Sequence, residues 1–260
     1  MDDTDLDRAH AAMMAAPEND AARVAFYDCF ADAQIVLLLA EEAAAETVRP
    51  AVVELGGDRY TVVFDTEERL AAFSGAVAPY AGLSGRGLAE MLAGQKIGIA
   101  LNPEVAPSTM LIPAEAVDWL AQTLAHAPTE ATARPVEILP PGALPEALTG
   151  ALTRKLRGAG ALASSAFLAG VRYADGSRGH LLAFIDAAPD AQPGLAIAAN
   201  EALTFSGLEA GAMDVTFVES GSTMATRLAR VGLDVALPRP AVPEGPAAPG
   251  RDPDRPPKLT

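Results

Sequence analysis

Asp65 and Arg69 form a charged pair whose spacing suits a binding site. They lie four residues apart, where a predicted strand (59–65) gives way to a predicted helix (67–73). At this spacing a carboxylate and a guanidinium can meet on one helical face, and an exposed pair contributes a few tenths of a kcal/mol. At the end of a strand, the same two groups could instead contact a protein partner or a carboxylate ligand. We predict Asp65 and Arg69 as binding residues on this second basis.

A second polar stretch follows the apolar strand predicted at residues 97–101. Asn102 precedes Pro103, and a residue before proline is pushed towards extended backbone conformations. Its side-chain amide could bond back to the loop, or it could contact a ligand at the end of the strand. Ser108 comes shortly afterwards, just before a short predicted strand (109–112). Asn102 and Ser108 complete our set of ligand- or partner-binding residues.

The residues that most often carry metal or nucleophilic chemistry are few and poorly spaced. The three histidines have no Cys, His, Asp or Glu at ligand spacing on a helix. The single cysteine has acidic neighbours, which disfavour a reactive thiolate, and it shares a helical face with apolar residues. We therefore predict no metal, no cofactor and no catalytic residue. The residues concerned are His10, His126, His180 and Cys29.

Acidic side chains leave one enzymatic alternative open. A carboxylate site could be built from Asp65, Glu67 and Glu68, which are close in sequence. Such a site would need two of these groups in a dry pocket with raised pKa values.

Two further segments could bind an anion. A glycine-rich segment (82–87) precedes a predicted helix, but no clear strand comes before it and no Lys-Ser/Thr pair closes it. We interpret residues 80–87 as a flexible loop. Ser222 and Thr223 begin another predicted helix, where their hydroxyl groups would either hold an anion or cap the helix.

The charge balance argues against two classes of partner. The 260 residues carry 34 acidic and 19 basic side chains, and the first 125 residues hold 20 acids against 7 bases. Such a surface repels nucleic acid phosphates and anionic lipid headgroups. The longest apolar run (35–40) is far too short for a membrane span, and the acidic start is no signal peptide. With a single cysteine, these features favour a cytoplasmic protein.

The order of the predicted elements is mixed and lacks the regular strand–helix alternation of a doubly wound sheet. We predict an α+β protein of two mixed α/β domains, with small, largely antiparallel or mixed sheets packed by helices. The predicted domains are residues 1–125 and 141–237, joined by a proline-rich linker (126–140). The proline-rich tail (238–260) has few large apolar residues and is expected to be disordered.

Four segments of the first half stand out by their order and spacing: AFYDCFADAQIVLLLA (25–40), VVFDTEERLAAF (62–73), YAGLSGRGLAEML (80–92) and IGIALNPEVAPSTMLIPAEAVDWL (97–120). Together they resemble the SseB-like family, named for enhanced serine sensitivity in bacteria. The second half resembles the C-terminal domain of longer members. The resemblance implies a cytoplasmic α/β protein without established catalytic chemistry, and the name describes a phenotype rather than a mechanism.

These observations together favour a non-catalytic protein that regulates by binding a protein partner. The alternative is a small-molecule sensor, with an amino acid as first candidate because of the phenotype in the family name. The carboxylate enzyme described above is the third hypothesis.

Overall fold

The computed structural model describes residues 3–42, 48–125, 135–142, 144, 146–157, 159–206 and 213–238. It contains two separate sheets, and we call the parts that carry them the N-terminal half (3–125) and the C-terminal half (135–238). Each sheet is mostly antiparallel with one parallel pair, and helices pack against both of its faces. The predicted α+β fold with small mixed sheets is confirmed.

The N-terminal half contains α1 (Asp5–Ala15), α2 (Asp20–Asp32), β1 (Gln34–Leu38), β2 (Val52–Leu55), β3 (Asp58–Phe64), α3 (Glu67–Ser74), β4 (Tyr80–Ser84), α4 (Gly85–Leu92), β5 (Gly98–Leu101), β6 (Met110–Ile112) and α5 (Ala114–Leu124). Its strands are ordered β4-β1-β3-β5-β6, and β2 pairs with the first part of β3. β3 and β5 are parallel neighbours, so their carboxyl ends meet at one edge of the sheet.

Alternation along the strands divides the apolar residues of this half between two faces. In β3, Val63 enters the large core that is covered by α1, α2, α4 and α5. Its neighbours Val62 and Phe64 point the other way, towards Leu70 of α3. Successive side chains of a strand point to opposite faces of the sheet. Both sets can therefore be buried only where helices cover both faces, as they do here.

The C-terminal half contains β7 (Pro135–Leu139), α6 (Glu146–Lys155), the 3₁₀ turn η1 (Ala159–Ala161), β8 (Ser165–Tyr173), β9 (Arg178–Ile185), η2 (Pro189–Ala191), α7 (Gln192–Thr204), β10 (Met213–Val218), α8 (Thr223–Val231) and β11 (Leu233–Val235). Its strands are ordered β10-β9-β8-β11, and β7 also pairs with β8. α6 and α7 contribute to the core on one face, and α8 packs on the other.

The two halves share an arrangement of strands that the sequence does not reveal. In each, an antiparallel pair (β1 with β3, β8 with β9) is followed by a parallel neighbour (β5, β10). An antiparallel strand lies on the other side of the first member (β4, β11). The chain order differs, because β4 precedes β5 whereas β11 follows β10.

The prediction of a flexible glycine-rich loop at residues 80–87 is wrong. Residues Tyr80–Ser84 form β4, which pairs antiparallel with β1, and α4 begins directly afterwards. A glycine-containing segment without clear alternation has little strand signal of its own, and here the neighbouring strand decides its conformation. The predicted linker (126–140) contains β7 in its last part. The rest of the linker up to residue 134, and the tail from residue 239, lie outside the described residues.

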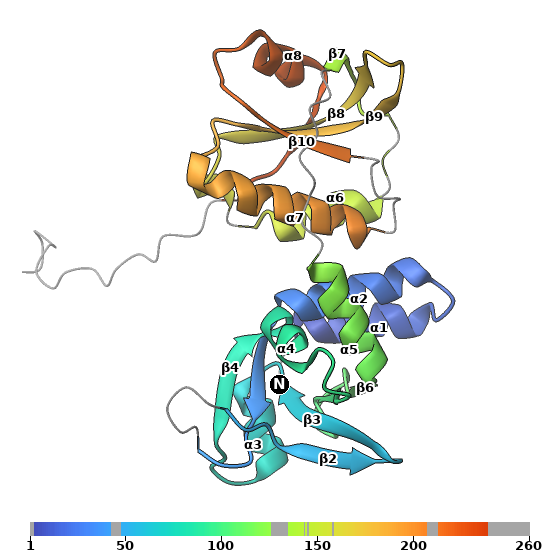
Figure 1. Cartoon of the computed structure of the whole chain (residues 1–260), viewed down its shortest axis with the longest axis vertical. Coiled ribbons are helices and arrows are strands. Elements are labelled where there is room, and N and C mark those ends of the chain that lie inside the picture. Colours follow the sequence, from blue (N-terminus) through green and yellow to red (C-terminus); the bar gives the residue numbers. More distant parts are fainter. Residues whose placement is uncertain are drawn as a thin grey trace, which may run out of the picture.

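The two halves meet through helices (Figure 1), with α6 and α7 facing the helices of the N-terminal half. Among the described elements, none of one half packs along an element of the other, so the junction is made mainly by long side chains. Among the described residues, Phe205 at the end of α7 crosses it: this side chain is 2% exposed and joins the core cluster of the N-terminal half. A junction of this kind is thin compared with either core.

Candidate functional site

The four residues predicted as a binding site lie together at one end of the N-terminal sheet. Asp65 directly follows β3 and Asn102 directly follows β5, and the parallel pairing places both at the same edge. Asn102 accepts a hydrogen bond from the Asp65 backbone N–H at 3.2 Å and donates to Ser108 Oγ at 2.9 Å. Arg69 donates to both carboxylate oxygens of Asp65, at 2.8 and 2.9 Å. The four residues therefore form one hydrogen-bonded network, linked through side chains and the Asp65 backbone N–H.

α1 closes over this network with two polar side chains that sequence reasoning missed. Arg69 donates to both oxygens of Asp7, and Thr4 Oγ1 donates to Asp65 Oδ2 at 2.6 Å. The side chains of Arg69, Asp7 and Asp65 are only 2, 3 and 4% exposed. The pairing of Asp65 with Arg69 is therefore a buried contact rather than an exposed one, because α1 covers the guanidinium.

The charged forms of Asp7 and Arg69 are stabilised by their partners in this network. Burial alone would raise the pKa of Asp7, but hydrogen bonds from Arg69, Ser108 and the Thr4 backbone outweigh it and hold the pKa well below its usual range. Burial would lower the pKa of Arg69, and the two carboxylates raise it instead. Since the protein's own groups occupy the guanidinium, the network fixes α1 on the end of the sheet.

The backbone of Asn102 differs from the extended conformation expected before Pro103. Its φ is +47°, in the left-handed region that asparagine tolerates better than most residues. The side chain is fully buried. Its Oδ1 accepts a hydrogen bond from the Asp65 backbone, and its Nδ2 donates one to Ser108. These bonds, made within the folded protein, outweigh the local preference imposed by proline.

The carboxylates of the enzymatic alternative do not gather in one place. Glu67 and Glu68 are exposed in the first turn of α3, whereas Asp65 is buried beside Arg69. A hydrogen bond with Glu67 raises the pKa of Tyr80 on the neighbouring β4. In the part of the chain that the structure describes, these three acids therefore form no shared dry pocket.

A second charged cluster, which the sequence did not indicate, lies at the junction of the halves. Asp28 and Asp32 come from α2, Arg86 from α4, Arg154 and Lys155 from α6, and Glu201 from α7. Arg86 binds both oxygens of Glu201, at 2.6 and 2.9 Å, and reaches Asp32 at 3.3 Å. Arg154 donates to Asp28 at 2.9 Å. We call these six residues the junction cluster.

Lys155 is the centre of the junction cluster. Its side chain is 3% exposed, and its Nζ lies 2.8 Å from Asp28, 2.8 Å from Asp32 and 3.1 Å from Glu201. The Nζ atom also lies 5.6 Å from the centre of the Phe205 ring. Burial would lower the pKa of Lys155, but the carboxylates of Asp28 and Asp32 raise it, so the amine stays charged.

The contacts of Lys155 are close but not all well directed. Asp28 Oδ1 and Lys155 Nζ form no hydrogen bond of good geometry, despite their 2.8 Å separation. Their attraction is therefore chiefly that of two charges. Because both groups also lose their hydration on burial, such a contact adds little net stability, yet removing one partner is costly.

A groove of about 680 Å³ lies beside the junction cluster. Its walls come from α1 and α2 of the N-terminal half and from the end of α6 of the C-terminal half. Its apolar lining includes Leu6, Ala25 and half-buried Cys29. Burial is the main cause that raises the pKa of the Cys29 thiol to about 11, and the negative charge of Asp5 is the second. Its charged lining has both signs: Asp5, Asp32 and Asp65 face Arg8, Arg154 and Arg157.

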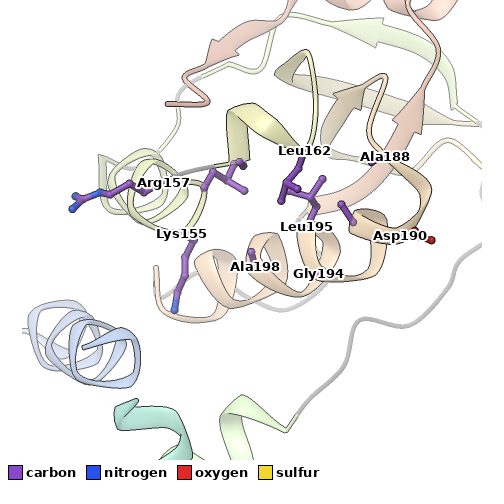
Figure 2. A pocket seen from close by; sticks show the side chains of 11 residues that line it. Lys155, Arg157, Leu162, Ala188, Asp190, Gly194, Leu195 and Ala198 are labelled. Atoms are coloured by element: carbon purple, nitrogen blue, oxygen red, sulfur yellow. The ribbon is translucent and has the colours of Figure 1, made fainter. Parts of the chain in front are cut away.

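A second pocket of about 570 Å³ lies within the C-terminal half (Figure 2). It is lined mainly by small and apolar residues of η1 and α7, with Leu162 and Leu195 at its centre. Lys155 and Arg157 point away from this centre, Lys155 towards the helices of the N-terminal half. This pocket therefore offers a ligand few polar contacts.

The remaining candidate residues have structural roles. Ser222 accepts a hydrogen bond from the Ala225 backbone and caps α8, as the capping alternative requires. Ser84 caps α4 in the same way, within the glycine-rich segment. His180 contacts the Pro141 carbonyl at 3.0 Å. Within the described ranges, no three His, Cys, Asp or Glu side chains are placed to hold a metal ion.

A search for membrane-crossing segments gave none: among the described residues, no helix combines the length and the apolar character that a bilayer requires.

Comparison with known proteins identifies the first part of the chain. Residues 6–119 match the family model described as the SseB protein N-terminal domain. The match spans elements α1 to α5 and confirms the family suggested by the four sequence segments. No curated protein and no solved structure matches the chain.

Proposed function

Because residues 6–119 belong to the SseB N-terminal domain family, we propose that this protein is a non-catalytic regulatory factor that acts by binding a protein partner. We propose that it works in the cytoplasm, and that the two halves correspond to the domains 1–125 and 141–237. The separate apolar cores of the halves support the division. The acidic surface argues against nucleic acid and anionic membranes as partners.

The observation that supports a protein partner best is the exposed strand β2. All four of its residues are exposed, and Val52, Val53 and Leu55 remain 43, 38 and 45% accessible. β2 pairs with β3 along one edge, and no other described strand pairs with Val52–Leu55 along the opposite edge. An apolar edge strand invites pairing, so proteins usually protect it. We propose that an extended segment of the partner adds to this edge and buries these side chains.

Replacing Val53 by lysine is expected to abolish partner binding without unfolding the protein. The new charge would be buried by an incoming strand, whereas it stays hydrated in the free protein. The full chain and the variant would be immobilised, and the proteins that each retains compared. The amides of Val52–Leu55 should also become protected from hydrogen exchange when the retained protein is bound.

The matched control is Val77→Lys, which adds the same charge at a fully exposed valine outside any strand. A protein retained by the wild-type chain and by the control, but lost with Val53→Lys, would support the proposal. Equal retention by all three chains would refute β2 as the binding edge.

A second candidate function is supported by the groove beside the junction cluster. A volume of about 680 Å³ suits a small molecule, and a lining with both signs of charge suits a zwitterion. The phenotype in the family name makes amino acids, serine among them, the first class to test. We propose that the groove binds such a ligand with its carboxylate towards Arg154 and Arg157, and its ammonium group towards Asp32.

A thermal-shift screen of the twenty amino acids at millimolar concentration tests this candidate. A ligand present at 100 times its Kd adds about 2.7 kcal/mol to the free energy of unfolding. The shift should disappear in Arg157→Met, which changes an exposed groove residue, and persist in Arg172→Met, whose arginine pairs with Glu137 elsewhere. Unchanged melting temperatures across the whole screen would exclude this ligand class.

A further inference from the structure

The two halves are joined by a small set of charged and aromatic contacts. Lys155 and Phe205 of the C-terminal half reach furthest into the N-terminal half, as their low exposure shows. Lys155 lies between Asp28 and Asp32, and Phe205 packs in the core cluster beside Trp119, with the two ring centres 6.5 Å apart. We call Lys155 and Phe205 the plug, and the surface around Asp28, Asp32 and Trp119 the socket.

The net charges that the two halves contribute to the junction cluster are equal and opposite. In the N-terminal half the cluster contributes Asp28, Asp32 and Arg86, which leaves one negative charge. In the C-terminal half it contributes Arg154, Lys155 and Glu201, which leaves one positive charge. When the halves are in contact, these two net charges neutralise each other. When the halves separate, the two junction surfaces carry opposite charges and are hydrated again.

The central contact of the closed arrangement, between Lys155 and Asp28, adds little net stability. Lys155 and Asp28 give up their hydration almost completely, at 3 and 1% exposure, without a well-directed hydrogen bond between them. The described helices and strands of the two halves do not pack closely along one another, and Phe205 supplies the apolar contact between them. Thin and polar interfaces between domains normally permit relative motion.

We infer that the plug and socket form a latch, and that the two halves separate as folded units when the charge of Lys155 is lost. The groove takes its walls from both halves, so it is complete only in the latched state. Any molecule that contacts both walls must then favour closure, because a ligand stabilises the state that it binds more tightly. The latch itself is independent of which ligand or partner the protein binds.

Lys155→Met in the full chain is the direct test. Methionine has a side chain of similar length without charge, so Asp28 would be left buried beside Arg154 alone. Trp119, the only tryptophan, is 41% exposed in the closed structure and contacts Phe205 edge-on, so its emission reports on the loss of that ring. We expect Trp119 emission to move to longer wavelength, acrylamide quenching to increase, and the radius of gyration from X-ray scattering to rise. The far-ultraviolet circular dichroism should stay unchanged, because both halves remain folded.

Lys96→Met serves as the control, because it removes an exposed lysine outside the junction cluster and should change none of these readings. If Lys155→Met leaves Trp119 emission and the radius of gyration at their wild-type values, the junction cluster is no latch. If it instead lowers the helical signal, the cluster belongs to the folding of the halves themselves, and the inference is equally wrong.

A second variant separates loss of charge from loss of packing. Asp28→Leu alone should also open the junction, because Lys155 would lose a close partner. Asp28→Leu with Lys155→Met should close it again, since replacing both members of a buried ion pair by apolar residues is often neutral or stabilising. Recovery of wild-type Trp119 emission in the double variant would support the latch, and additive opening would contradict it.

Discussion

Replacing Arg69 by methionine is expected to lower the free energy of unfolding by about 3–5 kcal/mol. Arg69 is 2% exposed, and it is the cation that contacts both Asp7 and Asp65 in the network at the end of the N-terminal sheet. Without it, two carboxylates would face each other out of contact with water. They must then protonate, or α1 must leave the sheet to hydrate them. Urea unfolding of the full chain measures this loss.

Two comparisons make the Arg69 prediction specific. Arg69→Lys keeps the charge but cannot donate to two carboxylates with one planar group, so it should recover only part of the stability. Arg59→Met removes an exposed arginine that bonds the Gln95 carbonyl, and it should be nearly neutral. A loss for Arg69→Met no larger than that for Arg59→Met would show that the network does not hold α1 in place.

The Arg69 effect should also depend on pH with a definite sign. Folding lowers the pKa of Asp7 from its ordinary value of 3.8, so its contribution is complete well above that value and declines as the pH falls below it. The difference in unfolding free energy between the wild-type chain and Arg69→Met should therefore be largest near neutral pH. It should become smaller below about pH 4, where the unfolded chain takes up the proton.

Gly85→Ala is expected to have an effect of similar size through packing rather than charge. A Cβ atom at Gly85 would lie 1.8 Å from the Phe30 carbonyl oxygen and 2.8 Å from its carbon. These are backbone atoms at the end of α2, and no rotamer change can move them aside. α4 must therefore shift away from α2, at a cost of about 3 kcal/mol, the upper end of the usual range for overpacking. Thermal or urea unfolding of the variant measures this cost.

Gly82→Ala, three residues earlier on β4, is the matched control. Nothing lies within 4 Å of a Cβ atom placed there, so this substitution should change stability by no more than about 0.5 kcal/mol. The shift of α4 in Gly85→Ala would also carry Arg86 away from Asp32 across the same helix pair. Equal stability of the two alanine variants would mean that α2 and α4 do not approach each other as closely as the structure indicates.

The sequence located part of the buried network because strand ends can be recognised locally. Asp65 and Asn102 each follow an apolar run, and Arg69 follows Asp65 by one helical turn. The closure by α1 could not be predicted, because Asp7 and Arg69 are 62 residues apart. A local signal was nevertheless present, since Thr4 and Asp7 form a capping box at the start of α1.

The junction cluster was beyond the reach of sequence reasoning for the same physical reason. In the sequence, Asp28 and Asp32 are simply acidic neighbours of Cys29, and Lys155 is one of three basic residues between positions 154 and 157. Arg154 and Asp28 are 126 residues apart, and neither segment contains a local pattern that identifies the other as its partner. Periodicity identifies which face of a helix is buried, but it cannot pair charges that lie on two different helices.

Phe205 and Thr4 also bear on how far the N-terminal half can stand alone. The matched region, residues 6–119, begins after Thr4 and ends well before Phe205. Yet Thr4 bonds to Asp65, and Phe205 fills a place in the core cluster of that half. A fragment cut to the matched region would lose both, and would expose the aromatic surface around Tyr27 and Trp119 to self-association. In this chain, the region that matches the family model is therefore smaller than the region needed to shield the N-terminal core from water.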